Sequence, residues 1–224
     1  MRYRAVLFDL GNTLVACWER AEWPTVLDEA ITEVAAHLAV SVNPEELSSR
    51  VEAERGERDD LRLRPLAARL ARIFEVPEVD LDACRAFMGP LFARARVYDD
   101  VLPTLAELRR RDILTGILSN TPWGSPAELW REELDRLGLA DAVDAVVFCD
   151  DVGWRKPDPR PFRFICEKLD VSPADCLFIG DDSRWDIVGP RGVEMDALLI
   201  DRASSARPDD AEAISSLAEF LHRL

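Results

Sequence analysis

Histidine is scarce in this chain, which contains only His37 and His222 among its 224 residues. His37 lies in a helical pattern, and His222 is the third residue from the C-terminal end. We interpret both as structural residues. Their scarcity excludes a zinc site built from several histidines, and a Ser-His-Asp triad would have to recruit one of these two side chains.

Long apolar runs and closely spaced cysteine pairs are also missing. No stretch approaches the roughly 20 apolar residues that a membrane-spanning helix needs, and Arg4 and Asp9 interrupt the only apolar run near the N-terminus. We therefore expect no signal peptide and no membrane partner. The five cysteines are odd in number and form no C-x-x-C pair. This pattern is typical of reduced thiols and predicts a cytoplasmic protein.

Positive charge is in short supply, because 28 Lys and Arg residues face 43 Asp and Glu residues and the formal net charge is −15. Such a balance argues against nucleic acid or an anionic membrane as a partner. An anionic substrate would have to meet local cations, or a bound metal, inside a field that repels it. Since 48% of the residues are apolar, the chain can bury a sizeable core. Its length suits one large domain or a core with a smaller insert.

The hydrophobic pattern changes its period along the chain. A short buried strand is predicted over about residues 4–9, and helical signals then continue to about residue 97. They include Trp23–Leu38 and an amphipathic segment that Asp80 caps. The charged run Arg50–Arg64 is interpreted as a solvated helix face or a bend.

From residue 99 onward, helical and strand patterns alternate, which predicts a parallel sheet covered on both faces. The fold class is therefore α/β, a Rossmann-like parallel sheet with helices on both faces plus an inserted all-helical cap domain. We place the core in residues 1–14 and 98–224 and the cap in residues 15–97. The predicted elements of the second part are helices at about 100–110, 126–137 and 161–169, strands at 113–118, 145–148, 176–179 and 196–200, and a closing helix in 203–224.

Four polar motifs follow these strands and turns. Asp9 ends the first strand, and an acid at the carboxyl end of a buried parallel strand lies where open α/β sheets bind ligands. The other three motifs are Ser119-Asn120, Lys156 between a glycine turn and two prolines, and Asp181-Asp182 with Asp186. Each motif alone has a simpler explanation, such as a helix cap, a surface lysine or a helix start with favourable dipole interactions.

In this order, the four motifs resemble those of the haloacid dehalogenase superfamily, a group of mostly phosphate-transferring hydrolases, from Arg4 to about Asp201. The resemblance implies that Asp9 is a nucleophile that forms an aspartyl-phosphate. It also implies that Asp9, Asp181 and the carbonyl of Gly11 hold Mg²⁺. Lys156 would add positive charge beside Asp9 and the phosphate.

The resemblance assigns the remaining polar residues to the phosphate and to the metal. Ser119, or the backbone N–H groups after it, would bond the phosphoryl oxygens, and one of Asp182 and Asp186 would orient the metal ligands from behind. The full set of expected site residues is Asp9, Ser119 and Lys156 for catalysis, Asn12, Thr13, Ser119, Asn120 and Lys156 for phosphate, and Asp9, Gly11, Asp181, Asp182 and Asp186 for the metal.

The first motif departs from the usual pattern of the resembled phosphatases. Most of them carry a second aspartate where this chain has Gly11, and a glycine where it has Asn12. The usual aspartate protonates the leaving oxygen, and losing such a group typically costs about 10² to 10⁴ in rate. We expect either a slow enzyme or a proton supplied by a water, a cap residue or the substrate.

These features favour Mg²⁺-dependent hydrolysis of a small phosphate monoester, with two alternatives. The first is 2-haloacid dehalogenation, because dehalogenases also lack the second aspartate and Trp185-Asp186 is similar to their last motif. Against it, dehalogenases usually have an aromatic residue where Gly11 lies and non-acidic groups where Asp181 and Asp182 lie. The second alternative is a descendant that binds a phosphorylated ligand without turning it over.

Overall fold

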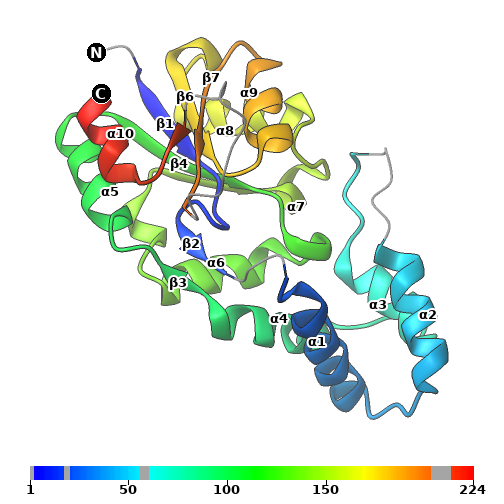
Figure 1. The fold of residues 1–224 in the computed structure, drawn as a ribbon. Helices are drawn as coiled ribbons and strands as arrows, with labels where there is room; N and C mark the ends of the chain where they lie inside the picture. Colours follow the sequence, from blue (N-terminus) through cyan, green and yellow to red (C-terminus); the bar gives the residue numbers. More distant parts are fainter. Residues whose placement is uncertain (1–2, 18–20, 56–60, 203–212) are drawn as a thin grey trace.

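A computed structural model describes residues 3–17, 21–55, 61–202 and 213–224. Its centre is a six-stranded sheet of order β5-β4-β1-β6-β7-β8, in which every pair is parallel. This arrangement confirms the predicted α/β class (Figure 1). The strands of the sheet are β1 (Ala5–Phe8), β4 (Leu114–Ser119), β5 (Ala145–Phe148), β6 (Cys176–Gly180), β7 (Asp196–Ile200) and β8 (Ala213–Ile214).

Helices cover both faces of the sheet because alternate residues of each strand point to opposite sides. On β1, Val6 and Phe8 belong to one buried cluster, and Ala5 and Leu7 belong to a second cluster. The first cluster includes residues of α5, α6 and α10, and the second includes residues of α8. The helices of this part are α5 (Val101–Arg110), α6 (Ala127–Arg136), α7 (Cys149–Val152), α8 (Pro159–Leu169), α9 (Gly189–Arg191) and α10 (Leu217–Arg223), with single turns at Pro122–Gly124, Ala140–Ala142, Pro173–Asp175 and Ser183–Val188.

Four further helices lie between the short strands β2 (Val15–Ala16) and β3 (Arg96–Val97), which pair antiparallel. We call these helices, together with the described segments that connect them, the helical insert. They lie to one side of the sheet in Figure 1, with α1 beside α4 and α2 beside α3. Asp80 caps α4 as expected, since its side chain accepts a hydrogen bond of 2.8 Å from the Ala83 N–H. The helices are α1 (Trp23–Leu38), α2 (Pro44–Arg55), α3 (Leu66–Phe74) and α4 (Leu81–Arg94).

Two sequence-based expectations need correction. The expected closing helix of residues 203–224 is instead the strand β8 followed by α10, while residues 203–212 lie outside the described residues. A strand of two residues is too short for its alternation to be recognised. Within the charged run 50–64, Glu54 is buried rather than solvated, and Arg64 and Arg72 both bond its carboxylate.

No helix within the described residues is both long enough and apolar enough to cross a membrane.

Candidate active site

The register of the sheet brings the polar motifs to one edge. Phe8 lies opposite Ile117 on β4 and Ile179 on β6, so the three strands end within two residues of one another. Asp9 follows β1 directly, and its N–H bonds the Ile179 carbonyl at 2.9 Å. Strand-end side chains therefore meet in one pocket of about 190 Å³. Its lining comprises Asp9, Leu10, Gly11, Asn12, Cys17, Ser119, Asn120, Pro122, Trp130, Asp181, Asp182, Trp185 and Asp186.

Lys156 is the buried cation of this site, with only 1% of its side chain exposed. Its Nζ donates to Oδ1 of Asp9 at 2.6 Å and to Oδ1 of Asp186 at 2.7 Å. Burial by itself lowers the pKa of Lys156, but the charges of Asp186 and Asp9 outweigh burial and raise the pKa above its usual value. The lysine therefore stays charged between the two carboxylates.

Ser119 and Asn120 support this ion pair in different ways. Ser119 Oγ donates to Oδ1 of Asp9 at 3.2 Å. The Asn120 side chain instead bonds the main chain of Lys156, with Oδ1 accepting from its N–H at 2.8 Å and Nδ2 donating to its carbonyl at 3.1 Å. Both polar atoms of the Asn120 side chain therefore hold the loop that carries Lys156, which we call the lysine loop. Asn120 also lines the pocket.

Three carboxylates converge opposite the lysine. One oxygen each of Asp9, Asp181 and Asp186 lies within 4.8 Å of the others. Desolvation in the pocket, followed by the negative charges of Asp9 and Asp186, raises the pKa of Asp181 to about 7. Burial likewise raises the pKa of Asp186. Three carboxylates exceed one ammonium in charge, and oxygen-only donors are the ligands that Mg²⁺ prefers, so the residues present fit a hard divalent cation.

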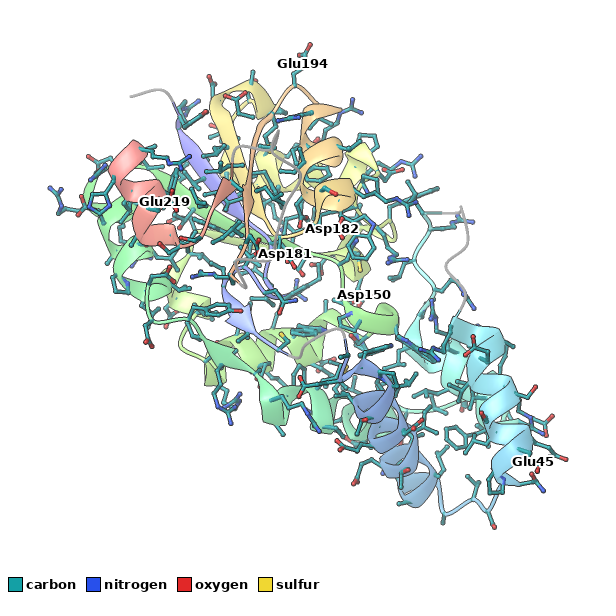
Figure 2. The ribbon with its side chains drawn as sticks, viewed as in Figure 1. Glu45, Asp150, Asp181, Asp182, Glu194 and Glu219 are labelled. Carbon is teal, nitrogen blue, oxygen red and sulfur yellow. The ribbon has the colours of Figure 1, made fainter. Side chains whose placement is uncertain are left out.

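Asp182 lies next to this cluster but points its carboxylate elsewhere. Its Oδ1 accepts from the N–H groups of Arg184 at 2.8 Å and Trp185 at 3.0 Å, which caps the π-helical turn Ser183–Val188. The Asp182 N–H in turn donates to Oδ2 of Asp186 at 3.0 Å. Figure 2 shows Asp181 and Asp182 on the side of the sheet that faces the helical insert. Of the two candidates for orienting the metal ligands, Asp186 belongs to the carboxylate cluster, whereas Asp182 is the N-cap of the Ser183–Val188 turn.

Gly180 makes this arrangement possible, and the sequence analysis missed it. An added Cβ at Gly180 would overlap the Asp186 carboxylate, so Asp186 can pack against the end of β6 only because residue 180 has no side chain. A glycine that ends a strand just before an acidic motif is a signal that could have identified this contact.

The loop after Asp9 places its residues differently. Gly11 and Asn12 line the pocket, and Asn12 has a φ of 54°, a left-handed conformation that asparagine tolerates. The Thr13 side chain is fully buried and does not line the pocket. A Cβ built at Gly11 would lie 3.9 Å from Cys17 Sγ, an ordinary contact.

Cys17 and Trp130 line the pocket without any motif that points to them. Burial and the charge of Asp9 raise the pKa of Cys17 to about 12, so its sulfur is a neutral thiol and a weak nucleophile. Trp130 donates from Nε1 to Ser125 Oγ at 2.9 Å. A buried aromatic residue on an amphipathic helix looks the same in sequence whether it faces a core or a pocket.

The helical insert contacts the two loops that flank the site. The Leu63 N–H bonds the Gly153 carbonyl at 3.0 Å, and the Arg155 N–H bonds the Leu61 carbonyl at 2.8 Å. At the other loop, a Cβ at Gly124 would overlap the carbonyl oxygen of Arg64. The insert therefore packs directly against the loop that carries Lys156 and the loop that follows Ser119.

Comparisons with known proteins identify relatives of this chain. A glyceraldehyde 3-phosphate phosphatase of Methanopyrus kandleri is 31% identical over 202 residues, which cover 89% of this chain and 84% of the relative. A phosphatase of Mycobacterium tuberculosis is 38% identical over 129 residues, and that alignment covers only 58% of either chain.

Two solved structures match nearly the whole chain. A phosphatase of the haloacid dehalogenase family from Thermococcus onnurineus superposes with a TM-score of 0.70 at 26% identity, covering 98% of this chain and 97% of that one. A 2-haloacid dehalogenase from Pseudomonas syringae pv. tomato superposes with a TM-score of 0.68 at 25% identity, covering 99% of each chain. Residues 3–193 match the family model of haloacid dehalogenase-like hydrolases, and the chain therefore belongs to that family of hydrolases, as its four motifs indicate.

Proposed function

We propose that this hydrolase cleaves a small phosphate monoester through an aspartyl-phosphate on Asp9, with Mg²⁺ as cofactor. The observation that carries the proposal is the cluster of Asp9, Asp181 and Asp186 around Lys156 at the carboxyl edge of the sheet. Relatives with phosphatase activity in their names support phosphate-ester hydrolysis.

The first chemical step forms a bond between a carboxylate oxygen of Asp9 and phosphorus while the bond from phosphorus to the ester oxygen breaks, and that oxygen leaves as an alcohol with a proton from a water, the insert or the substrate. Lys156 and Ser119 both bond Oδ1 of Asp9, which fixes the plane of the attacking carboxylate. The Lys156 ammonium also supplies positive charge beside the phosphoryl oxygens as the transition state forms. Water then attacks the phosphorus of the aspartyl-phosphate, which releases phosphate and restores the Asp9 carboxylate.

Mg²⁺ held by Asp9, Asp181 and the Gly11 carbonyl would neutralise the phosphoryl charge that Asp9 otherwise repels. Asp186 would orient this site from behind, because its Oδ1 holds Lys156 and its Oδ2 accepts from the N–H that follows Asp181. Asp182 would act as a structural cap rather than as a ligand.

We propose the helical insert as the cap that limits substrate size. The pocket measures about 190 Å³, and the insert contacts the loops on both sides of it. A small phosphorylated metabolite fits such a site, whereas a duplex or a folded protein does not.

The dehalogenase alternative is favoured by several of the comparisons, among them the similarity to the 2-haloacid dehalogenase structure. The site weighs against it, because three converging carboxylates repel one another strongly without a metal cation. An anionic haloacid would meet the same repulsion.

Phosphate release from an aryl phosphate and from a panel of sugar, acid and nucleoside phosphates tests the proposal, with Mg²⁺ and with EDTA. We expect release that needs Mg²⁺ and is lost in Asp9→Asn. Halide release from 2-haloacids without metal would instead establish the dehalogenase, and binding of the esters without turnover would establish a silent binder.

The pair Asp181→Asn and Asp182→Asn separates metal binding from capping within two adjacent residues. We expect Asp181→Asn to weaken Mg²⁺ binding, measured by calorimetry, at least about tenfold. Asp182→Asn should keep the Mg²⁺ affinity within about threefold and leave the thermal midpoint nearly unchanged, because an asparagine oxygen caps a helix about as well as a carboxylate. Equal losses of Mg²⁺ affinity in both variants would contradict the assignment of Asp182 as a cap.

A further inference from the structure

The main chain of the nucleophile loop, defined here as residues 9–15, is held by a side chain far away in sequence. Arg202, which lies two residues beyond the end of β7, donates to the carbonyl of Thr13 from Nε at 3.1 Å and from Nη2 at 2.7 Å. The same guanidinium donates from Nη1 to both carboxylate oxygens of Asp100, at 2.8 and 2.7 Å. One arginine therefore joins the nucleophile loop to the start of α5.

Further contacts fix this arginine in place. Its guanidinium carbon lies 4.1 Å from the ring centroid of Tyr98, and the Tyr98 N–H bonds the Leu14 carbonyl at 3.1 Å. Asp100 Oδ2 also accepts from the Leu217 N–H at 2.7 Å. With 11% of the Arg202 side chain and 17% of the Asp100 side chain exposed, solvent and salt screen this pair less than a surface ion pair.

The internal hydrogen bonds of the nucleophile loop fold it onto itself. The N–H groups of Leu14 and Val15 both bond the Leu10 carbonyl at 2.9 Å, and the Asn12 N–H bonds the Val15 carbonyl at 2.7 Å. These bonds shape the turn but do not orient it against the sheet. A hydrogen bond from the Asp9 N–H to the Ile179 carbonyl anchors the start of the loop. Near its end, the hydrogen bonds from Arg202 to the Thr13 carbonyl anchor it.

We propose that Arg202 is a positioning residue for catalysis, which fixes Asp9 and the Gly11 carbonyl by anchoring the nucleophile loop through Thr13. It touches neither the pocket nor the reacting atoms, and its effect passes through the main chain of residues 9–13. An error of about 1 Å in the position of a nucleophile can cost on the order of 10²-fold in rate. The catalytic part of this inference rests on the proposed phosphatase function, whereas the anchoring of the loop does not.

The test compares Arg202→Met, Arg202→Lys and the control Arg94→Met. Arg94 forms an ion pair with Glu29 within the helical insert and donates to the Pro90 carbonyl, so its loss removes comparable contacts away from the loop. Amide hydrogen exchange of residues 9–15 reports the order of the loop directly, without any need for turnover. Phosphate release then gives kcat and KM for the folded protein, well below the midpoint of thermal unfolding.

For Arg202→Met we expect exchange of the Asn12, Leu14 and Val15 amides to accelerate at least about tenfold. We also expect kcat to fall on the order of 10²-fold while KM changes less than about threefold. Relative to Arg202→Met, Arg202→Lys should recover more of the wild-type thermal stability than of the wild-type kcat. A single ammonium cannot reproduce the paired bonds to Thr13 and Asp100. Arg94→Met should leave both the loop exchange and kcat unchanged.

Normal loop exchange and normal kcat in Arg202→Met would overturn the inference. If Arg202→Met does not fold, the same two measurements on Arg202→Lys decide the question. Should the wild-type protein release no phosphate from any ester, the proposed function fails while the exchange data still test the anchoring. If the wild-type protein hydrolyses an ester but amide exchange of the nucleophile loop is unaltered in Arg202→Met, the proposed function stands and only the role of Arg202 is excluded.

Discussion

The carboxyl edge of the sheet and the helical insert use charge in opposite ways. At the sheet edge, Lys156 is buried between Asp9 and Asp186. In the insert, ion pairs such as that of Arg50 with Glu75 lie at the surface, where 68% of the Glu75 side chain is exposed. Disrupting a buried ion pair lowers the free energy of unfolding strongly, whereas an ion pair at the surface contributes little to it. We therefore infer that charge at the sheet edge serves the proposed chemistry, whereas in most of the insert it serves solubility and helix stability.

Glu54 is the exception within the insert. Its buried carboxylate bonds Arg64 and Arg72, and hydrogen bonding to Arg72 is the main reason that its pKa lies below the usual value. This cluster ties α2 to α3 and to the segment that contacts the Gly153 and Gly124 loops. Even here, charge holds the insert in shape, and we assign it no chemical step.

The sharpest test of this contrast is Asp9→Asn. We expect turnover to fall on the order of 10⁴-fold or more, since an amide cannot form the aspartyl-phosphate. The fold should persist, because Lys156 keeps its ion pair with Asp186. Phosphate release and circular dichroism on the same sample check both statements, and near-normal turnover in this variant would remove Asp9 as the nucleophile.

Matched losses of a cation compare the two regions directly. Lys156→Met leaves three carboxylates without their cation, and we expect the free energy of unfolding to drop by about 3 kcal/mol. Arg55→Met removes a surface cation that pairs with Glu52 in the insert and should cost less than about 1 kcal/mol. Urea unfolding in EDTA measures both. Similar losses in the two variants would abolish the distinction between the regions.

Gly11→Asp asks whether the proton for the leaving group comes from the pocket or from elsewhere. The Cβ position is free apart from a 3.9 Å contact with Cys17, so the backbone there tolerates a Cβ. We expect kcat on poor leaving groups to rise about tenfold, towards the range typical of general acid catalysis. Gly11→Asn is the matched control without an acid. No gain with Asp would indicate that a water, the insert or the substrate already supplies the proton.

The smallest expected effect concerns pH. The folded-state pKa of Asp181, about 7, lies above its ordinary value of 3.8, so the folded protein binds this proton more tightly than the unfolded chain. Its contribution to stability without metal is therefore present below pH 4 and is lost as the pH rises towards 7.

In EDTA, Asp181→Asn should consequently be more stable than the wild type at pH 8, with a smaller difference near pH 4. Mg²⁺ should raise the thermal midpoint of the wild type more at pH 8 than at pH 5, because binding requires the ionised carboxylate. Thermal melts across this range measure both effects. A Mg²⁺ shift that does not depend on pH would contradict the role given to Asp181.

Local pattern was sufficient for most elements of the fold. Trp23–Leu38 and Ala145–Phe148 match their predicted bounds, because helical and strand periods depend on residues close in sequence. The strand β8 escaped prediction because two residues carry too little pattern. Pairing of Leu63 with Gly153 escaped it because no local signal marks which distant segment will supply a partner.

Composition and motif order by themselves determined the class of fold, the hydrolase family, and the set of polar residues to which we assign the proposed chemistry. Only the tertiary structure decided how those residues divide their tasks: Asp186 joins the acidic cluster, Asp182 caps a turn, Asn120 holds the lysine loop, and Arg202 reaches the Thr13 carbonyl. Residue type and order establish which groups are available, because they set the local period and the chemistry. The direction in which each group points depends on hydrogen bonds between segments far apart in the chain.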